Sequence, residues 1–147
     1  MPFRSLRILA LAGLSIGASI AWADPSAAGD KCSPRTLKGE YIYALSGFKT
    51  AGDSAAQRTP FAQAGNEQFK GDGTMSGAGT MSLNGVIAKV TYKGTYTLNA
   101  DCSGTVTFTD NQGQVAHYDI FADNDGDSFT YLQTDAGIVS AGWERRH

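Results

Sequence analysis

Apolar and polar residues alternate along most of the chain after residue 36, which is the pattern of β-strands with one buried face. In the first such segment, Leu37, Gly39, Tyr41, Tyr43 and Leu45 fall on one face. No apolar period of 3.6 residues extends beyond about two turns in this part of the chain. The pattern therefore predicts an all-β protein.

Eight segments carry this pattern, and Gly, Asn and Asp separate them at regular intervals. The predicted strands are 37–46, 61–70, 74–83, 86–98, 105–110, 115–122, 128–134 and 138–145. Asn84-Gly85 is the clearest hairpin signal, because both residues accept the positive φ of a type I′ turn. The segment 48–60 is small and polar, and we expect it to be a long loop over one end of the fold.

Short connections make consecutive strands pair antiparallel. An open sheet of eight strands would expose two unpaired edges, and closure into a barrel removes both. We therefore predict a single antiparallel eight-stranded up-and-down barrel, with a two-sheet β-sandwich as the alternative. Glycines inside the strands, among them Gly77 and Gly79, are predicted to let the strands bend.

The first 23 residues form a separate segment. Arg4 and Arg7 precede the apolar run Ile8 to Ile20, and Ala21-Trp-Ala23 places small residues where a signal peptidase reads. The run of about 13 residues is shorter than the ~20 that a spanning helix needs. We expect a signal peptide at 1–23, a flexible lead-in at 24–36 and a β-barrel domain at 37–147. The protein would be periplasmic or secreted, without membrane insertion after cleavage.

The charge of the chain argues against some partners. The sequence holds 12 basic and 14 acidic residues, and removing Arg4 and Arg7 leaves a net charge of −4. A nucleic-acid surface would be basic and clustered. We therefore expect neither nucleic acid nor an anionic membrane surface as a partner, and we expect a monomer.

Cys32 and Cys102 are the two cysteines of the chain, and in an oxidising compartment they are most simply a disulfide. The zinc alternative would use His117 and His147, but their spacing matches no Cys/His pattern. The Asp-rich segment 123–127 departs from the order of a calcium loop and is typical of a hairpin turn. We expect no metal and no cofactor.

One pair of residues is a candidate for acid/base chemistry. His117 and Asp119 share a strand face, and such a pair can transfer protons if both side chains lie inside a cavity. Glu40, Glu67 and Glu144 are scattered along the chain and form no paired catalytic motif. Alternation alone leaves open which face of the His117 strand is interior, so enzymatic activity stays an open alternative.

The strand aromatics either fill a core or line an apolar pocket with hydroxyls that orient a ligand. The candidate lining residues for a ligand are Tyr41, Tyr43, Met75, Met81 and Tyr131.

Several short motifs carry a resemblance that covers nearly all of the chain after the signal peptide. They are a leading cysteine, Leu37-x-Gly-x-Tyr41, Gly71-Asp-Gly73, Gly94-Thr-Tyr96, Asp101-Cys-x-Gly104 and Gln133-Thr-Asp135-x-Gly-x-Val139-Ser-x-Gly142. With them the chain resembles a group of uncharacterised exported bacterial proteins, itself similar to calycin-like barrels of the lipocalin and allene oxide cyclase type. The resemblance implies a Cys32–Cys102 disulfide and a small apolar molecule bound in the barrel.

Three functions follow as hypotheses. The first is an exported small barrel that binds a small apolar ligand. The second is a surface or interaction protein, antigen-like, that binds no ligand. The third is an isomerase- or cyclase-like enzyme in a calycin barrel, with His117 and Asp119 as its acid and base.

Overall fold

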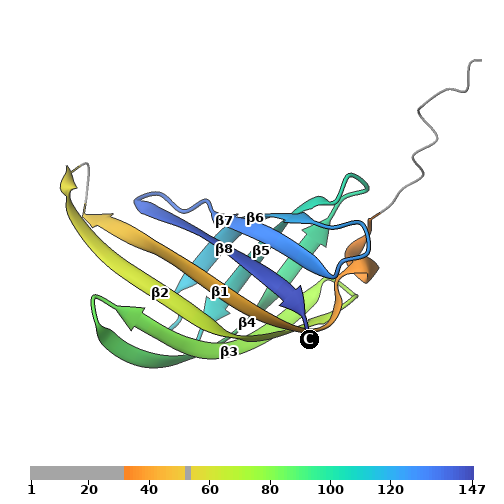
Figure 1. Cartoon of the computed structure of the whole chain (residues 1–147), viewed down its shortest axis with the longest axis horizontal. Helices are drawn as coiled ribbons and strands as arrows, with labels where there is room; N and C mark the ends of the chain where they lie inside the picture. The colour runs from red at the N-terminus through yellow and green to blue at the C-terminus, as the bar shows by residue number, and fades with distance from the viewer. Residues whose placement is uncertain (1–31, 52–53) are drawn as a thin grey trace, which may run out of the picture.

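The computed structural model describes residues 32–51 and 54–147, and they form a closed antiparallel barrel in which each strand pairs with the next and β8 pairs with β1 (Figure 1). The predicted eight-stranded up-and-down barrel is confirmed. The predicted signal peptide and residues 24–31 of the predicted lead-in lie outside the described residues. The elements are the 3₁₀ helix η1 (Pro34–Thr36) and the strands β1 (Lys38–Ala51), β2 (Ser54–Lys70), β3 (Thr74–Leu83), β4 (Val86–Leu98), β5 (Ser103–Asp110), β6 (Val115–Ala122), β7 (Ser128–Gln133) and β8 (Ile138–Arg146).

The turn residues set most strand boundaries. β3, β4 and β6 begin and end where the alternation predicts. The turn between β3 and β4 has positive φ at both central residues, 49° at Asn84 and 85° at Gly85, which is the type I′ geometry expected for this pair.

The segment predicted as a long loop, 48–60, is instead the end of a long hairpin. β1 and β2 stay paired through Lys49 and Thr59 to Ala51 and Ser54, and β8 also pairs with β1 as far as Lys49. The loop prediction is wrong because a partner strand satisfies the backbone of these small polar residues, which need no buried face of their own. The hairpin projects at the end of the barrel opposite to the C-terminus (Figure 1).

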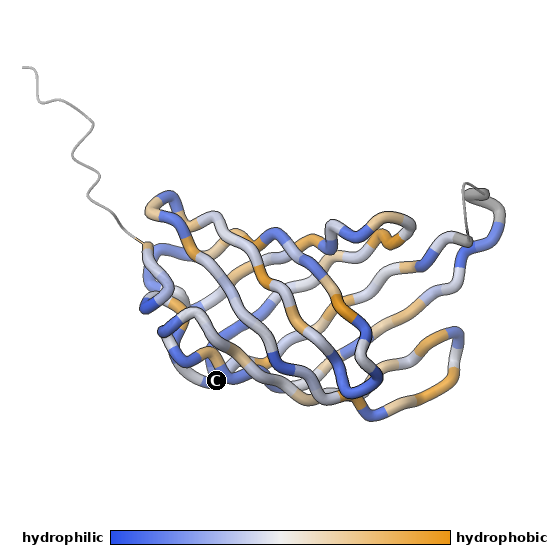
Figure 2. Tube along the Cα trace, turned by 180° about the vertical axis from the view of Figure 1, so that it is seen from behind, coloured by the Kyte–Doolittle hydropathy of each residue, from blue (hydrophilic) through white to orange (hydrophobic). Residues whose placement is uncertain are grey.

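One face of every strand points into the barrel, and apolar and polar residues alternate along the strands accordingly (Figure 2). At the end of the barrel that holds η1, this face is a packed aromatic cluster. The Phe69 ring contacts Tyr41, Phe129 and Tyr96 edge-on, with ring centroids 5.3, 5.5 and 5.0 Å away. Each such pair stabilises by about 0.5–1.5 kcal/mol beyond its buried area. We call this end the closed end.

The disulfide joins the chain before β1 to the β4–β5 turn, as predicted. Cys32 and Cys102 are bonded, buried, and separated by 70 residues. The Tyr96 hydroxyl donates to the carbonyl oxygens of Pro34 and Leu37, each at 2.8 Å, and Leu37 is fully buried. The last residues of the predicted lead-in are therefore fixed over the closed end. Among the described residues there is no helix with the length and apolar character to cross a membrane.

Candidate functional site

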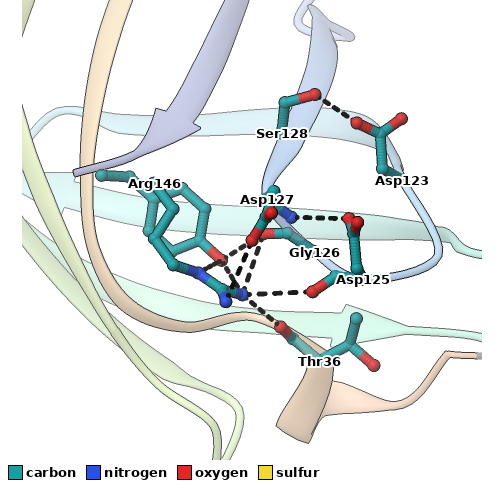
Figure 3. A network of polar contacts seen from close by, with 8 residues as sticks. Thr36, Asp123, Asp125, Gly126, Asp127, Ser128 and Arg146 are labelled. Atoms are coloured by element: carbon teal, nitrogen blue, oxygen red, sulfur yellow. Dashed lines mark hydrogen bonds and ion pairs between the residues drawn. The ribbon is translucent and has the colours of Figure 1, made fainter.

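Arg146, near the end of β8, links the segments that cover the closed end. Its guanidinium donates to the Tyr41 hydroxyl at 3.1 Å and to the carbonyl oxygens of Thr36 and Gly126, each at 3.0 Å, and it forms an ion pair with Asp127 at 3.2 Å (Figure 3). The Tyr41 hydroxyl in turn donates to the Gly126 carbonyl at 2.6 Å. One side chain thus joins η1, β1 and the β6–β7 turn.

The β6–β7 turn, residues 123–127, is held by its own hydrogen bonds. The Asp123 carboxylate accepts from the Ser128 hydroxyl, and the Asp125 carboxylate accepts from the Asp127 amide at 3.1 Å (Figure 3). Within 32–51 and 54–147, no cluster of three or more His, Cys, Asp or Glu side chains is arranged to hold a metal ion. The segment acts as a hairpin turn, as its sequence indicates.

Next to the aromatic cluster, on the side away from the closed end, lies a small cavity that we call the inner cavity. It leaves about 20 Å³ for the centre of a water molecule, which is room for about one water. Aromatic rings and two carboxyl groups dominate its walls, and none of the described lining side chains is basic. The inner cavity is lined by Tyr43, Leu45, Gln63, Glu67, Tyr92, Val106, Phe108, Tyr118, Ile120, Phe129, Tyr131 and Glu144.

Glu67 lies in this cavity on β2 and is only 7% exposed. Its Oε1 accepts a 2.5 Å hydrogen bond from the Tyr92 hydroxyl. Burial raises the pKa of Glu67 from 4.5 to about 7, although the bond from Tyr92 acts in the opposite direction. The same burial and the nearby Glu67 charge raise the pKa of Tyr92, so its hydroxyl remains a donor. Glu67 is therefore a carboxyl group that changes charge near neutral pH.

Glu144 faces Glu67 from β8 and is 4% exposed. Its Oε2 is buried and accepts no hydrogen bond from the described residues when both carboxyl groups are ionised, whereas a proton on either group joins Glu144 to Glu67 by a hydrogen bond. Burial first, and then the neighbouring Glu67, raise the pKa of Glu144 well above its ordinary value. Two carboxyl groups this close cannot both be charged without a counter-ion, so they share a proton or bind a cation.

The positions of the two carboxyl groups follow from strand register. β2 and β8 both pair with β1, where Tyr41 pairs with Glu67 and Tyr43 pairs with Glu144. Since Tyr41 and Tyr43 point inward, both glutamates must point inward as well. The interior strand face thus brings together two residues that are 77 positions apart in the chain.

Three of the glycines inside the strands, Gly77, Gly79 and Gly142, leave room for the inward-pointing rings of tyrosines. A Cβ at Gly77 would lie 2.5 Å from the Tyr92 hydroxyl, and a Cβ at Gly142 would lie 2.6 Å from the Tyr131 hydroxyl. The Tyr43 hydroxyl occupies the same kind of space at Gly79. The sequence predicts that Gly77 and Gly79 let the strands bend, whereas the structure shows that they accept the tip of a ring from another strand.

The opposite end of the barrel, between the β1–β2, β3–β4, β5–β6 and β7–β8 hairpins, contains a larger cavity that we call the mouth. It leaves about 180 Å³ for the centre of a water molecule. Its walls carry apolar side chains from five strands, namely Phe61, Met81, Leu83, Phe108, Ala116 and Ile138. Polar and charged side chains line it as well, namely Lys49, Gln63, Asp110, Gln112, Gln114 and Gln133. Gln63, Phe108 and Tyr118 line both the mouth and the inner cavity, so the two spaces adjoin.

Polar groups at the base of the mouth are fixed by hydrogen bonds. The Gln63 side-chain amide donates to the Tyr43 hydroxyl at 2.7 Å. Gln133 accepts from the Ser140 hydroxyl at 3.0 Å and donates to the Asp135 carboxylate at 2.9 Å. A ligand in the mouth would meet apolar side chains and, between them, polar groups that these hydrogen bonds hold in place.

The predicted ligand-lining residues lie in three places. Tyr43 and Tyr131 line the inner cavity, and Met81 lines the mouth. Tyr41 and Met75 are buried, Tyr41 in the packing of the closed end, and neither lines the inner cavity or the mouth. The side chains of all five residues point into the barrel. The alternation along a strand identifies the residues of its inner face, but it does not show where along the barrel axis each of them lies.

His117 and Asp119 lie on the outer face of β6. The His117 side chain is 53% exposed, and its Nδ1 lies 2.7 Å from Asp135, not beside Asp119. The cavity location that the acid/base hypothesis requires is therefore not met, because Tyr118 and Ile120 take the interior face.

Sequence reasoning missed Glu67, Glu144 and Tyr92 as members of a site. The alternation along β2 could have indicated Glu67. Its side chain lies on the same strand face as those of Phe61 and Phe69, so it points into the barrel if the Phe69 ring does. Comparison of the chain with protein-family models, with curated proteins and with solved structures gave no match.

Proposed function

We propose that this protein is an exported barrel that binds a small, largely apolar molecule through the mouth. The observation that carries the proposal is the mouth itself, a space of about 180 Å³ for water centres with apolar side chains from five strands in its mixed apolar and polar lining, which adjoins the inner cavity. Protein side chains fill the closed end, so we expect the ligand to bind in the half of the barrel that contains the mouth.

The position of the mouth next to the inner cavity supports a ligand with an apolar body and one polar end. Phe61, Met81 and Ile138 would contact its apolar body, and burying each CH₂ group contributes about 0.8 kcal/mol. Polar groups where the mouth meets the inner cavity, Gln63 among them, would satisfy the polar end, which would otherwise lose its hydrogen bonds to water. The resemblance to calycin-like barrels agrees with this proposal, and the Cys32–Cys102 disulfide agrees with an oxidising, periplasmic or secreted location.

An interaction role is the second candidate. The closed barrel leaves no free sheet edge among its described strands, so such a role would use the outer face. Phe121 and Trp143 are 57% and 49% exposed there, and both pair with Thr130 across neighbouring strands. Trp143 is therefore a natural reporter for contacts on this face.

The test uses N-phenyl-1-naphthylamine, a neutral apolar fluorophore whose emission rises in an apolar site. We expect saturable binding to the full protein. Ala116→Trp, which places a large ring in the mouth, should weaken binding at least tenfold. Ala141→Trp adds the same ring on the exposed outer face of β8 and is the matched control.

Two results would contradict the proposal. The first is the absence of saturable binding to the unmodified protein. The second is equal binding by the Ala116→Trp and Ala141→Trp variants, which would place the fluorophore outside the mouth.

A further inference from the structure

Resting on the proposed function, we infer that the ligand's polar end is a protonated primary amine, which enters the inner cavity and binds between Glu67 and Glu144. The apolar body of the ligand would remain in the mouth. The inner cavity would thus select the chemical class, and the mouth would select size and shape.

The unpartnered oxygen is the first argument. When Glu67 and Glu144 are both ionised, Glu144 Oε2 is buried with no donor among the described residues, and a buried acceptor without a partner costs about 1–3 kcal/mol, more if it is charged. An ammonium group brings three donors, enough for one oxygen of each carboxyl group and one further acceptor. An amine therefore takes the place of the proton that the two carboxyl groups otherwise share, and it satisfies both of them in their ionised state.

Charge is the second argument. The lining of the inner cavity holds two carboxyl groups and none of the described basic side chains. The nearest described cation at the closed end, Arg146, is committed to Tyr41, Asp127 and backbone carbonyls. Bringing a positive charge between the two carboxyl groups lets both ionise, whereas an anionic ligand would be repelled.

The aromatic walls are the third argument. Tyr43, Tyr92 and Tyr131 line the inner cavity together with the two carboxyl groups, and aromatic rings attract a desolvated cation. The free space, about 20 Å³ for a water centre, suits a group of the size of water or ammonium and excludes a bulkier head.

The position of the cavity is the fourth argument. Gln63, Phe108 and Tyr118 line both spaces, so a short chain passing them would link an amine in the inner cavity to an apolar body in the mouth. The tyrosines that face Glu67 hold their protons at neutral pH, because burial raises the pKa of each. The titratable groups facing Glu67 are Tyr43 of β1, Tyr92 of β4, Tyr118 of β6, Tyr131 of β7 and Glu144 of β8.

The experiment compares two probes that share one apolar body, 2-phenylethylamine and 2-phenylethanol, by titration calorimetry at pH 8. We expect the amine to bind at least tenfold more tightly than the alcohol. Glu144→Gln should lower the amine affinity at least tenfold, whereas Glu40→Gln, an exposed glutamate on β1, should leave it unchanged. The circular dichroism of the Glu144→Gln variant is recorded alongside as a check that it is folded.

The unmodified protein provides a second readout. Lowering the pH from 8 to 5.5 adds a proton to the Glu67–Glu144 pair, so the preference for the amine should fall at least fivefold. Equal binding of amine and alcohol at pH 8, no binding of the amine, or a preference unaffected by pH would each overturn the inference. Fluorophore binding that persists in any of these cases would leave the proposed function of the mouth standing.

Discussion

Glu67 and Glu144 lie on opposite sides of β1 and face each other inside the barrel, and both are more than nine-tenths buried. Tyr92 donates to Glu67, while Glu144 keeps one oxygen without a donor among the described residues. A fold of this size can tolerate such a pair only by protonation or by binding a cation. The pair therefore links stability, pH and ligand chemistry in one place.

Stability should fall as the pH rises from about 5 to 8. The pKa of Glu67 is raised by burial from 4.5 to about 7, so between these values the folded state binds a proton that the unfolded state has released. The stabilisation is complete below the unfolded pKa and is lost as the pH passes the folded pKa. For Glu67 this amounts to about 3 kcal/mol. Urea denaturation at pH 5 and pH 8 measures the difference.

Glu67→Gln is the control for this pH effect, because it removes the titrating group and keeps the shape. The variant should show a much smaller difference between pH 5 and pH 8. A native protein that is more stable at pH 8 than at pH 5 would contradict the buried, raised-pKa state of the pair.

Gly77→Ala should destabilise the protein by about 1–3 kcal/mol, because the added methyl group overlaps the ring of Tyr92. In a Tyr92→Leu background the same change should cost much less, because the shorter side chain leaves the space free. Thermal or urea denaturation of the four proteins of this cycle gives the coupling. Strictly additive effects would show that Gly77 does not serve to accommodate Tyr92.

The comparison of sequence and structure separates local from long-range information. Asn84-Gly85 carries its turn in its own φ preferences, and β3 and β4 on either side were predicted to the residue. The β1–β2 hairpin beyond Phe48 could not be predicted in this way, because its small polar residues show no alternation and the backbone pairing of β1 with β2 holds them in strand conformation. Glu67 and Glu144 meet through the registers of two strand pairs, which no local pattern contains. The outward orientation of the His117 side chain could not be predicted from the sequence either, since both faces of its strand carry apolar residues.

Arg146→Ala should destabilise the closed end by about 2–3 kcal/mol, because the carbonyl oxygens of Thr36 and Gly126 lose a charged donor. Arg146→Lys should recover less than half of this, since one ammonium group cannot reproduce the planar fork of donors. Arg145→Ala, on the exposed face of the same strand, is the matched control. Urea midpoints that are equal for Arg146→Ala and Arg145→Ala would argue against the role of Arg146.

Neither Cys32 nor Cys102 should react with a thiol reagent in the native protein until it is reduced. Reduction should lower the free energy of unfolding by about 4 kcal/mol, since the bond closes a loop of 70 residues. Denaturation with and without dithiothreitol measures this loss. The double Cys→Ser variant should be insensitive to the reductant, and an equal response of both proteins would contradict the assignment.

The most direct test of the whole account is an NMR titration of the full protein with 2-phenylethylamine at pH 8. The account predicts saturable shifts at the Gln63 side-chain amide and at the backbone amides of Gly77 and Gly79, beside the hydroxyls of Tyr92 and Tyr43. The indole N–H of Trp143, on the outer face, should stay unchanged. Shifts centred on Trp143, or none at Gln63, Gly77 and Gly79, would contradict a binding site inside the barrel.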